Sequence, residues 1–325
     1  MKKLLAFVMA FMVMGTLFAG CGGGGDKKAA APAADGKKFI VIATGGTSGT
    51  YYPLGAAVAD ILNKNVKGAN ASAQSTGASV ANINLLQQGK ADIAFVQNDI
   101  TYYAVNGTEM FKDKKVSTLK GLATLYPETI QIVTLEKTGI KTLNDVKGKR
   151  VAVGAAGSGT EANARQILEA YGITYDDIKV QYLSFSEAAN ALKDGNVDIA
   201  FVTAGFPTAA IQDIASQHKV VLVPVDADKA DALIKKYPFY TKVTVPAKTY
   251  ANLDTETAAV AVRCMLVVTD KMDEQTAYGI TKAIYTNLDR LKQAHNVAST
   301  VSKANALEGM SITVAPGADK FFKEK

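Results

Sequence analysis

Two glycine-rich loops contain the residue types that bind an anion. Residues 45–50 read Gly-Gly-Thr-Ser-Gly-Thr, and residues 154–160 read Gly-Ala-Ala-Gly-Ser-Gly-Thr. Each loop opens a segment with helical periodicity, and the first N–H groups of a helix lack partners and have partial positive charge. Glycine lets the backbone approach a ligand closely, while Ser and Thr hydroxyls add donors. The loops therefore predict a site that holds a carboxylate without arginine.

The alternative interpretation is that these residues only make tight turns and N-caps. The presence of both loops at matching positions of two similar segments favours binding. Neither loop has the lysine of a P-loop, and the second has its glycines in the order GxxGxG, not the GxGxxG of dinucleotide sites. Neither Ser48 nor Ser158 has a glycine two residues away on both sides, as a nucleophile elbow requires.

The remaining reactive residue types do not form a catalytic or metal-binding pattern. The chain has two Cys and two His, and His218 and His295 lie far apart on segments predicted to be at the surface. Asp92 and Asp198 each precede an apolar run, which predicts turn caps, and Cys264 lies within an apolar run typical of a core strand. We therefore expect no enzyme activity, no cofactor and no metal.

Short apolar runs that alternate with helical segments must position the two loops. Residues 39–43 are predicted as a buried strand and residues 52–63 as a helix, and the same order recurs at residues 151–153 and 161–171. Residues 86–96 and 192–202 are nearly the same sequence, 106 residues apart, each with a helix end, a glycine turn and a core strand. This alternation predicts an α/β fold with two similar lobes and a ligand between them.

Composition narrows the possible functions. The 325 residues correspond to about two domains, and 48% hydrophobic with 20% charged residues is typical of a globular protein. The net charge of +6 includes Lys2 and Lys3, and the chain has only four scattered arginines without a basic, aromatic-rich patch. We therefore expect no nucleic-acid partner.

The N-terminus has the pattern of a secretory leader. A positive start is followed by the apolar residues 4–18 and by Leu-Phe-Ala-Gly before Cys21. This resembles the bacterial lipobox, so residues 1–20 are predicted as a lipoprotein signal peptide and Cys21 as the lipidated residue. Residues 21–37 are rich in Gly, Ala and Lys and are predicted to be a flexible tether. An ordinary secretory signal with a coincidental cysteine is the alternative.

Several motifs resemble those of the TAXI-type solute receptors of TRAP transporters. They are residues 43–55 with the pattern Gly-Gly-Thr-x-Gly-x-Tyr-Tyr, residues 95–99, 125–128, 157–161 and 201–207, and the tail at 309–318. The resemblance implies a type II periplasmic-binding-protein fold, with lobe one formed by residues 38–126 plus 257–325 and lobe two by residues 127–256. It also implies a hinge that the chain crosses twice and ligand closure between the lobes.

The resemblance also implies the site residues. Lobe one would contribute Gly46, Thr47, Ser48, Gly49, Thr50, Tyr51, Tyr52, Gln97 and Asp99, with Tyr126 and Glu128 near the first crossing; lobe two would contribute Ser158, Gly159, Thr160, Thr203, Ala204, Gly205 and Pro207. Core packing is the alternative for one of the adjacent tyrosines. An acid such as Asp99 beside an anion site would suit a ligand that also has an ammonium group.

Together these features predict a monomeric, extracytoplasmic, lipid-anchored receptor for a small carboxylated solute. Glutamate or a related amino or dicarboxylic acid is implied by the resemblance, with delivery to a TRAP-type membrane permease. A receptor for an ATP-driven importer is the first alternative. An extracytoplasmic enzyme or a sensory lipoprotein on the same fold is the alternative from another class.

Overall fold

The computed structural model describes residues 38–324. The predicted signal peptide, the tether and Cys21 lie outside the described residues. Residues 38–118 alternate strands and helices: β1 (Lys38–Ala43), α1 (Tyr51–Asn65), β2 (Ala69–Gln74), α2 (Ser79–Gln87), β3 (Ile93–Gln97), α3 (Asn98–Asn106) and the 3₁₀ helix η1 (Glu109–Phe111).

A long strand then leads into a second alternating region. The elements are β4 (Leu119–Leu135), η2 (Glu136–Thr138), η3 (Leu143–Val146), β5 (Arg150–Ala152), α4 (Gly159–Ala170), η4 (Tyr175–Asp177), β6 (Lys179–Gln181), α5 (Phe185–Lys193), β7 (Ile199–Ala204), α6 (Ala209–Ala215), β8 (Val220–Leu222), α7 (Ala227–Lys236) and β9 (Thr241–Val245). The chain ends with β10 (Thr257–Thr269), α8 (Glu274–Tyr285), α9 (Leu288–Ala294), η5 (Asn296–Thr300), η6 (Lys303–Asn305) and α10 (Pro316–Lys323).

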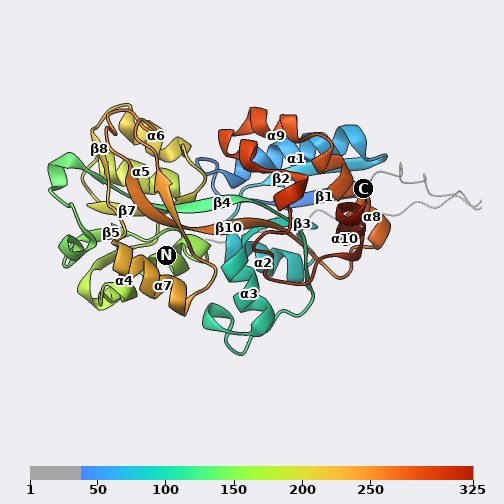
Figure 1. Ribbon diagram of the computed structural model, residues 1–325, viewed down its shortest axis with the longest axis horizontal. Coiled ribbons are helices and arrows are strands. Elements are labelled where there is room, and N and C mark those ends of the chain that lie inside the picture. Colours follow the sequence, from blue (N-terminus) through green and yellow to red (C-terminus); the bar gives the residue numbers. More distant parts are fainter. Residues whose placement is uncertain (1–37, 325) are drawn as a thin grey trace, which may run out of the picture. The chain divides into compact units, whose positions relative to one another are not determined.

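All ten strands found between residues 38 and 324 belong to one hydrogen-bonded sheet. Its order is β2-β1-β3-β10-β4-β7-β5-β6, with β8 paired to β4 and β9 paired to β10. The outer strands are parallel to their neighbours, whereas β4 and β10 run antiparallel to each other and to the strands beside them. Figure 1 shows these two long strands between the α1–α3 and α4–α7 groups of helices.

Both long strands pass from one group of strands to the other. Residues 264–267 of β10 pair with β3, while residues 257–261 pair with β9. In β4, residues 119–129 pair with β10 and residues 129–134 pair with β7. The proposed lobe boundaries after residues 126 and 256 therefore fall within β4 and at the start of β10.

The predicted secondary structure is confirmed in both regions. The four predicted segments correspond to β1, α1, β5 and α4, and the repeated sequence ends in the fully buried strands β3 and β7. Gly89 and Gly195 have φ values of 66° and 73°, so each copy of the repeat turns through a left-handed conformation that glycine adopts at no steric cost. Cys264 is buried within β10, as predicted for a core strand.

Candidate ligand-binding site

A cavity lies where both glycine-rich loops meet. Its lining comes from the stretches of chain that follow β1, β2, β5 and β6, from the last residues of β3 and β7, and from β4. The residues are Gly45, Gly46, Gly49, Thr50, Tyr51, Thr76, Gly77, Ala78, Ser79, Gln97, Glu128, Ala155, Ser158, Gly159, Thr160, Ser184, Phe185, Thr203 and Ala204. In the described part of the chain this lining contains no Lys or Arg.

Four helices begin at the cavity. Tyr51 starts α1, Ser79 starts α2, Gly159 starts α4 and Phe185 starts α5, and all four residues line the cavity. The N-terminus of a helix favours negative charge through its dipole and its unpaired N–H groups. The positive ends of four helix dipoles therefore face a cavity whose described lining has no cationic side chain.

The helix ends differ in how many N–H groups remain free. The Ser158 hydroxyl caps α4 by accepting from Glu161 N at 3.2 Å, and α5 has a capping box between Ser184 and Glu187. By contrast, α1 has no side-chain cap. The amides of α2 are occupied by the other lobe, because Val80 N and Ala81 N donate to Gly157 O at 3.1 and 3.2 Å.

Two carboxyl groups are buried close to the cavity. Glu128 lines it and accepts from Tyr51 OH at 2.5 Å through Oε1. Burial raises the pKa of Glu128 to about 8, although the Tyr51 hydrogen bond opposes this and the neighbouring Asp99 adds to it. Burial likewise raises the pKa of Asp99 to about 7. Within residues 38–324 neither carboxylate forms an ion pair with a Lys, Arg or His, so both are held in a neutral environment.

Direct hydrogen bonds join the two lobes around the cavity. Thr50 Oγ1 donates to Gly205 O and accepts from Gly205 N at 3.3 and 3.1 Å. Ala210 N donates to Ser48 O at 3.2 Å. With the bonds from α2 to Gly157, these contacts describe lobes that are closed on each other.

Most of the residues predicted for the site line the cavity. They are Gly46, Gly49, Thr50, Tyr51, Gln97, Glu128, Ser158, Gly159, Thr160, Thr203 and Ala204. The other predicted residues lie outside the lining: Thr47, Ser48, Tyr52, Asp99, Tyr126, Gly205 and Pro207. Of the adjacent tyrosines, Tyr51 faces the cavity and Tyr52 does not, whereas Asp99 is fully buried behind it.

Two lining segments were not among the predicted site residues. Residues 76–79 follow β2, and Ser184 and Phe185 follow β6, so both occupy the position between strand and helix that the two glycine-rich loops also occupy. The sequence Ser-Phe-Ser-Glu at 184–187 is a capping-box pattern and would have identified the start of α5. The α2 segment lacks such a pattern.

The described residues hold no other recognisable centre. Between residues 38 and 324, no group of three His, Cys, Asp or Glu side chains is arranged to hold a metal ion. In the same range no helix is both long and apolar enough to cross a bilayer. His295, predicted at the surface, is instead half-buried beside the cavity loop, where its Nδ1 accepts from Val297 N and burial lowers its pKa.

The sheet crossed by two long strands and the cavity between helix starts define the class of periplasmic-binding-protein folds. Similar solved structures include the aliphatic sulphonate binding protein SsuA of Escherichia coli (17% identity, 87% of this chain and 82% of that chain, TM-score 0.50) and PhnD1 of Prochlorococcus marinus in complex with methylphosphonate (11%, 82% and 91%, 0.54). A putative L-cystine ABC transporter of Listeria monocytogenes is also similar (16%, 82% and 98%, 0.51). These similarities confirm the predicted two-lobe α/β fold.

The chain belongs to the NMT1-like family, whose model matches residues 42–325. The match spans both lobes and the whole cavity.

Proposed function

We propose that this chain is an extracytoplasmic solute-binding protein that captures a small carboxylated solute and delivers it to a membrane transporter. The single observation that supports this most strongly is the convergence of four helix N-termini on a cavity whose described lining has no Lys or Arg. Backbone N–H groups there suit a carboxylate, because bonds from N–H to a charged acceptor are the stronger hydrogen bonds.

The cavity lining also includes hydrogen-bond acceptors, in addition to the N–H donors of the helix ends. Gln97 lines the cavity, and its Oε1 is a buried acceptor without a hydrogen-bond partner. Glu128 adds a buried carboxyl group, whose Oε1 accepts from Tyr51 OH. A solute with a carboxylate at one end and an N–H or O–H donor at another would satisfy both sets of groups. Glutamate or a related amino or hydroxy acid therefore fits this site, and we propose this class of solute.

Two kinds of membrane transporter are candidates for the partner of this protein. One solved structure with this fold is named as a putative L-cystine ABC transporter, which supports an ATP-driven importer as the partner. The sequence resemblance to TAXI-type receptors, centred on residues 45–52 at the cavity, supports a TRAP-type permease as the second candidate. Lipid attachment at Cys21 belongs to the same proposal.

A thermal-shift screen with amino, hydroxy and dicarboxylic acids tests solute binding. A compound at one hundred times its dissociation constant stabilises the folded state by about 2.7 kcal/mol, so the melting temperature should rise for at least one acid. The matched controls are the corresponding amides, which lack the carboxylate and should give no shift. If no acid raises the melting temperature, or if acids and amides act equally, the proposed carboxylate site is wrong.

Uptake measurements distinguish the two transporters. Membrane vesicles that contain the transporter and this protein should take up the identified solute either with internal ATP or with an imposed sodium gradient. Uptake that requires ATP supports the importer, and uptake that requires the gradient supports the TRAP-type permease.

A further inference from the structure

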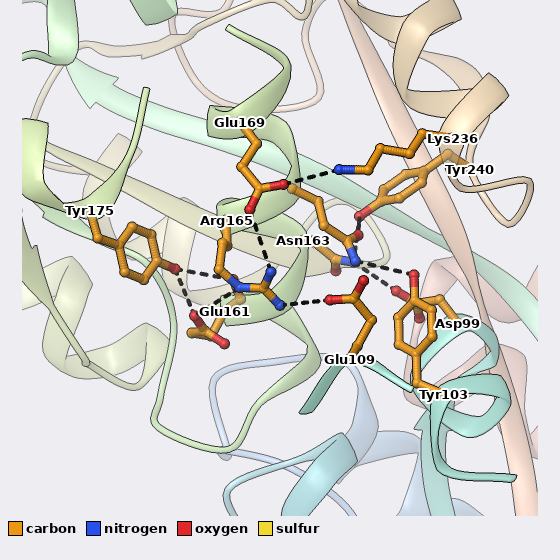
Figure 2. Close-up of polar contacts among 11 residues, drawn as sticks. Asp99, Tyr103, Glu109, Glu161, Asn163, Arg165, Glu169, Tyr175, Lys236 and Tyr240 are labelled. Carbon is orange, nitrogen blue, oxygen red and sulfur yellow. Dashed lines mark hydrogen bonds and ion pairs between the residues drawn. The ribbon is translucent and has the colours of Figure 1, made fainter. Parts of the chain in front are cut away.

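Behind the cavity lies a buried polar cluster centred on Asn163 of α4. Asn163 is completely buried and does not line the cavity. Its Nδ2 donates to Asp99 Oδ2 at 3.0 Å and to Tyr240 OH at 2.9 Å (Figure 2). Its Oδ1 accepts from Gln97 Nε2 at 2.9 Å and from Thr203 Oγ1 at 3.2 Å. All four hydrogen-bonding positions of this amide are therefore used.

Two neighbours determine which way the Asn163 amide points. Asp99 faces Asn163 with Oδ2, which accepts a hydrogen bond both in the ionised carboxylate and as the carbonyl oxygen of the neutral acid, so the NH₂ group lies on the Asp99 side. The Tyr240 hydroxyl donates to Gln166 Oε1 at 2.6 Å, which leaves its oxygen to accept from Asn163. Both neighbours thus place Nδ2 toward Asp99 and Oδ1 toward Gln97.

The orientation of Asn163 in turn determines that of Gln97. An acceptor at Asn163 Oδ1 requires a donor, so Gln97 presents Nε2 to it and its own oxygen points the other way. Gln97 Oε1 is buried without a hydrogen-bond partner, and it lies so close to Gly159 that a Cβ at that position would overlap it. Both Gln97 and Gly159 line the cavity.

We propose that Asp99, acting through Asn163, is a positioning residue that turns the Gln97 carbonyl oxygen toward the cavity, so that the site selects a solute with an N–H or O–H donor at that point. The selection rests on the proposed function, whereas the orientation of Gln97 is a property of the protein itself. A solute with a carbonyl at that point would place two acceptors together and leave both unpaired, which is strongly unfavourable in a buried site.

The groups around Asp99 support an acceptor role for its carboxylate. From α3 it is faced by Tyr103, from α4 by Asn163, from the segment before β9 by Tyr240, and from β4 by Glu128. Of these only Glu128 is acidic, and among the described residues no Lys or Arg pairs with Asp99. The Asn163 amide is thus the principal side-chain donor to Asp99.

Binding of a matched pair of probes tests the selection. L-Glutamate and 2-oxoglutarate differ in having an ammonium or a carbonyl group on the same carbon. By calorimetric titration the wild-type protein should bind the ammonium probe at least tenfold more tightly than the carbonyl probe. Asp99→Asn, which keeps the shape but can present either a donor or an acceptor, should reduce that ratio severalfold. Asp92→Asn is the matched control, because Asp92 accepts from Val41 N away from the cavity, and should leave the ratio unchanged.

A double-mutant cycle separates positioning from general damage. Gln97→Met removes the polarity of residue 97 while keeping its length, so it should abolish the preference. In that background Asp99→Asn should cause no further change in the ratio. The proposal is overturned if Asp99→Asn reduces the affinity ratio equally in the wild type and in Gln97→Met. It is also overturned if the wild type prefers 2-oxoglutarate.

An NMR measurement without any solute tests the positioning of Gln97 independently of the proposed solute class. The side-chain NH₂ signal of Gln97, identified by its absence in Gln97→Met, should exchange slowly with water in the wild type. It should shift and exchange faster in Asp99→Asn but not in Asp92→Asn. If neither acid binds while this signal behaves as expected, the choice of solute class is wrong and the positioning of Gln97 stands. If the signal is the same in wild type and Asp99→Asn, the positioning role is wrong whatever binds.

Discussion

Glu128 and Asp99 are two acids that the fold holds in an environment suited to their neutral forms. Burial raises the pKa of Glu128 to about 8 and that of Asp99 to about 7, above the values that such groups have in an unfolded chain. A carboxyl group with a raised pKa in the folded state binds a proton more tightly there. Its contribution to stability is therefore fully present below about pH 4 and is lost as the pH rises to about 8.

The free energy of unfolding should accordingly fall between about pH 4 and pH 8. Over the pH interval in which a group is protonated in the folded state but ionised in the unfolded state, each pH unit lowers the free energy of unfolding by roughly 1.4 kcal/mol. Asp99→Asn combined with Glu128→Gln should flatten this part of the profile and make the variant more stable than wild type at pH 8.5. Urea unfolding at several pH values measures it. An unchanged slope in the variant would show that these carboxyls are ionised in the folded protein.

At the scale of a single element, α4 meets the cavity with its first turn. A side chain at Gly159 would overlap Gln97, and one at Gly49 would meet the Phe185 ring at 3.3 Å. We expect Gly159→Val to abolish solute binding, because Gln97 must move, and Gly49→Val to weaken it strongly. Ser158→Ala should lose about 1–2 kcal/mol of binding energy and about 1 kcal/mol of stability through the lost N-cap.

Calorimetric titration with the acid found in the screen measures these losses, after circular dichroism confirms folding. Gly279→Val is the matched control, since a Cβ there, within α8, has no neighbour within 4 Å. Normal binding by both cavity glycine variants would contradict the role of the helix starts.

The same helix presents Arg165 to the other lobe. Its guanidinium pairs with Glu109 of η1 at 3.3 Å and with Glu161 and Glu169 of its own helix (Figure 2). Arg165 does not line the cavity, and partly exposed ion pairs are worth about 0–1 kcal/mol. Arg165→Ala should therefore weaken binding less than fivefold by calorimetry. Complete loss of binding in this variant would mean that a guanidinium holds the anion.

The parts of the fold that depend on local order could be predicted from the sequence. The units of strand, glycine-rich loop and helix could be predicted because their signals lie within about ten adjacent residues, and eleven of the predicted site residues line the cavity. The Asn163 cluster could not be predicted. Its partners Asp99, Gln97 and Tyr240 are 64, 66 and 77 residues away along the chain, and no periodicity links them. The displacement of Asp99 from the lining has the same cause, because only packing against α4 decides which side chain faces the solute.

At the scale of the whole molecule, the contacts between lobes predict a motion. Solute binding should favour the closed arrangement in which Thr50 bonds to Gly205 and Ser48 to Ala210. Small-angle scattering should show a smaller radius of gyration at saturation than without solute. The same radius in both conditions would indicate lobes that are closed at all times.

Attachment of the intact chain to the membrane is predicted to depend on Cys21. Cys21→Ser should release the protein from membranes or leave it unprocessed, because the modified cysteine would be the attachment point. Membrane fractionation with mass spectrometry of the N-terminal peptide measures this, and Cys264→Ser is the control within the folded region. Freely soluble wild-type protein without an acyl mass on residue 21 would exclude the anchor.

The carbonyl group of Gly157 links amide exchange in α2 to the opening of the two lobes. It is the acceptor for the amides of Val80 and Ala81 at the start of α2, although it belongs to the opposite lobe. Whenever the lobes separate, these two amides lose their acceptor and face water, while the rest of α2 keeps its internal bonds. Their deuterium uptake therefore reports the opening of the cleft. The bound solute can leave only through the same opening. Slow deuterium exchange at these two amides and slow dissociation of the solute should therefore occur together.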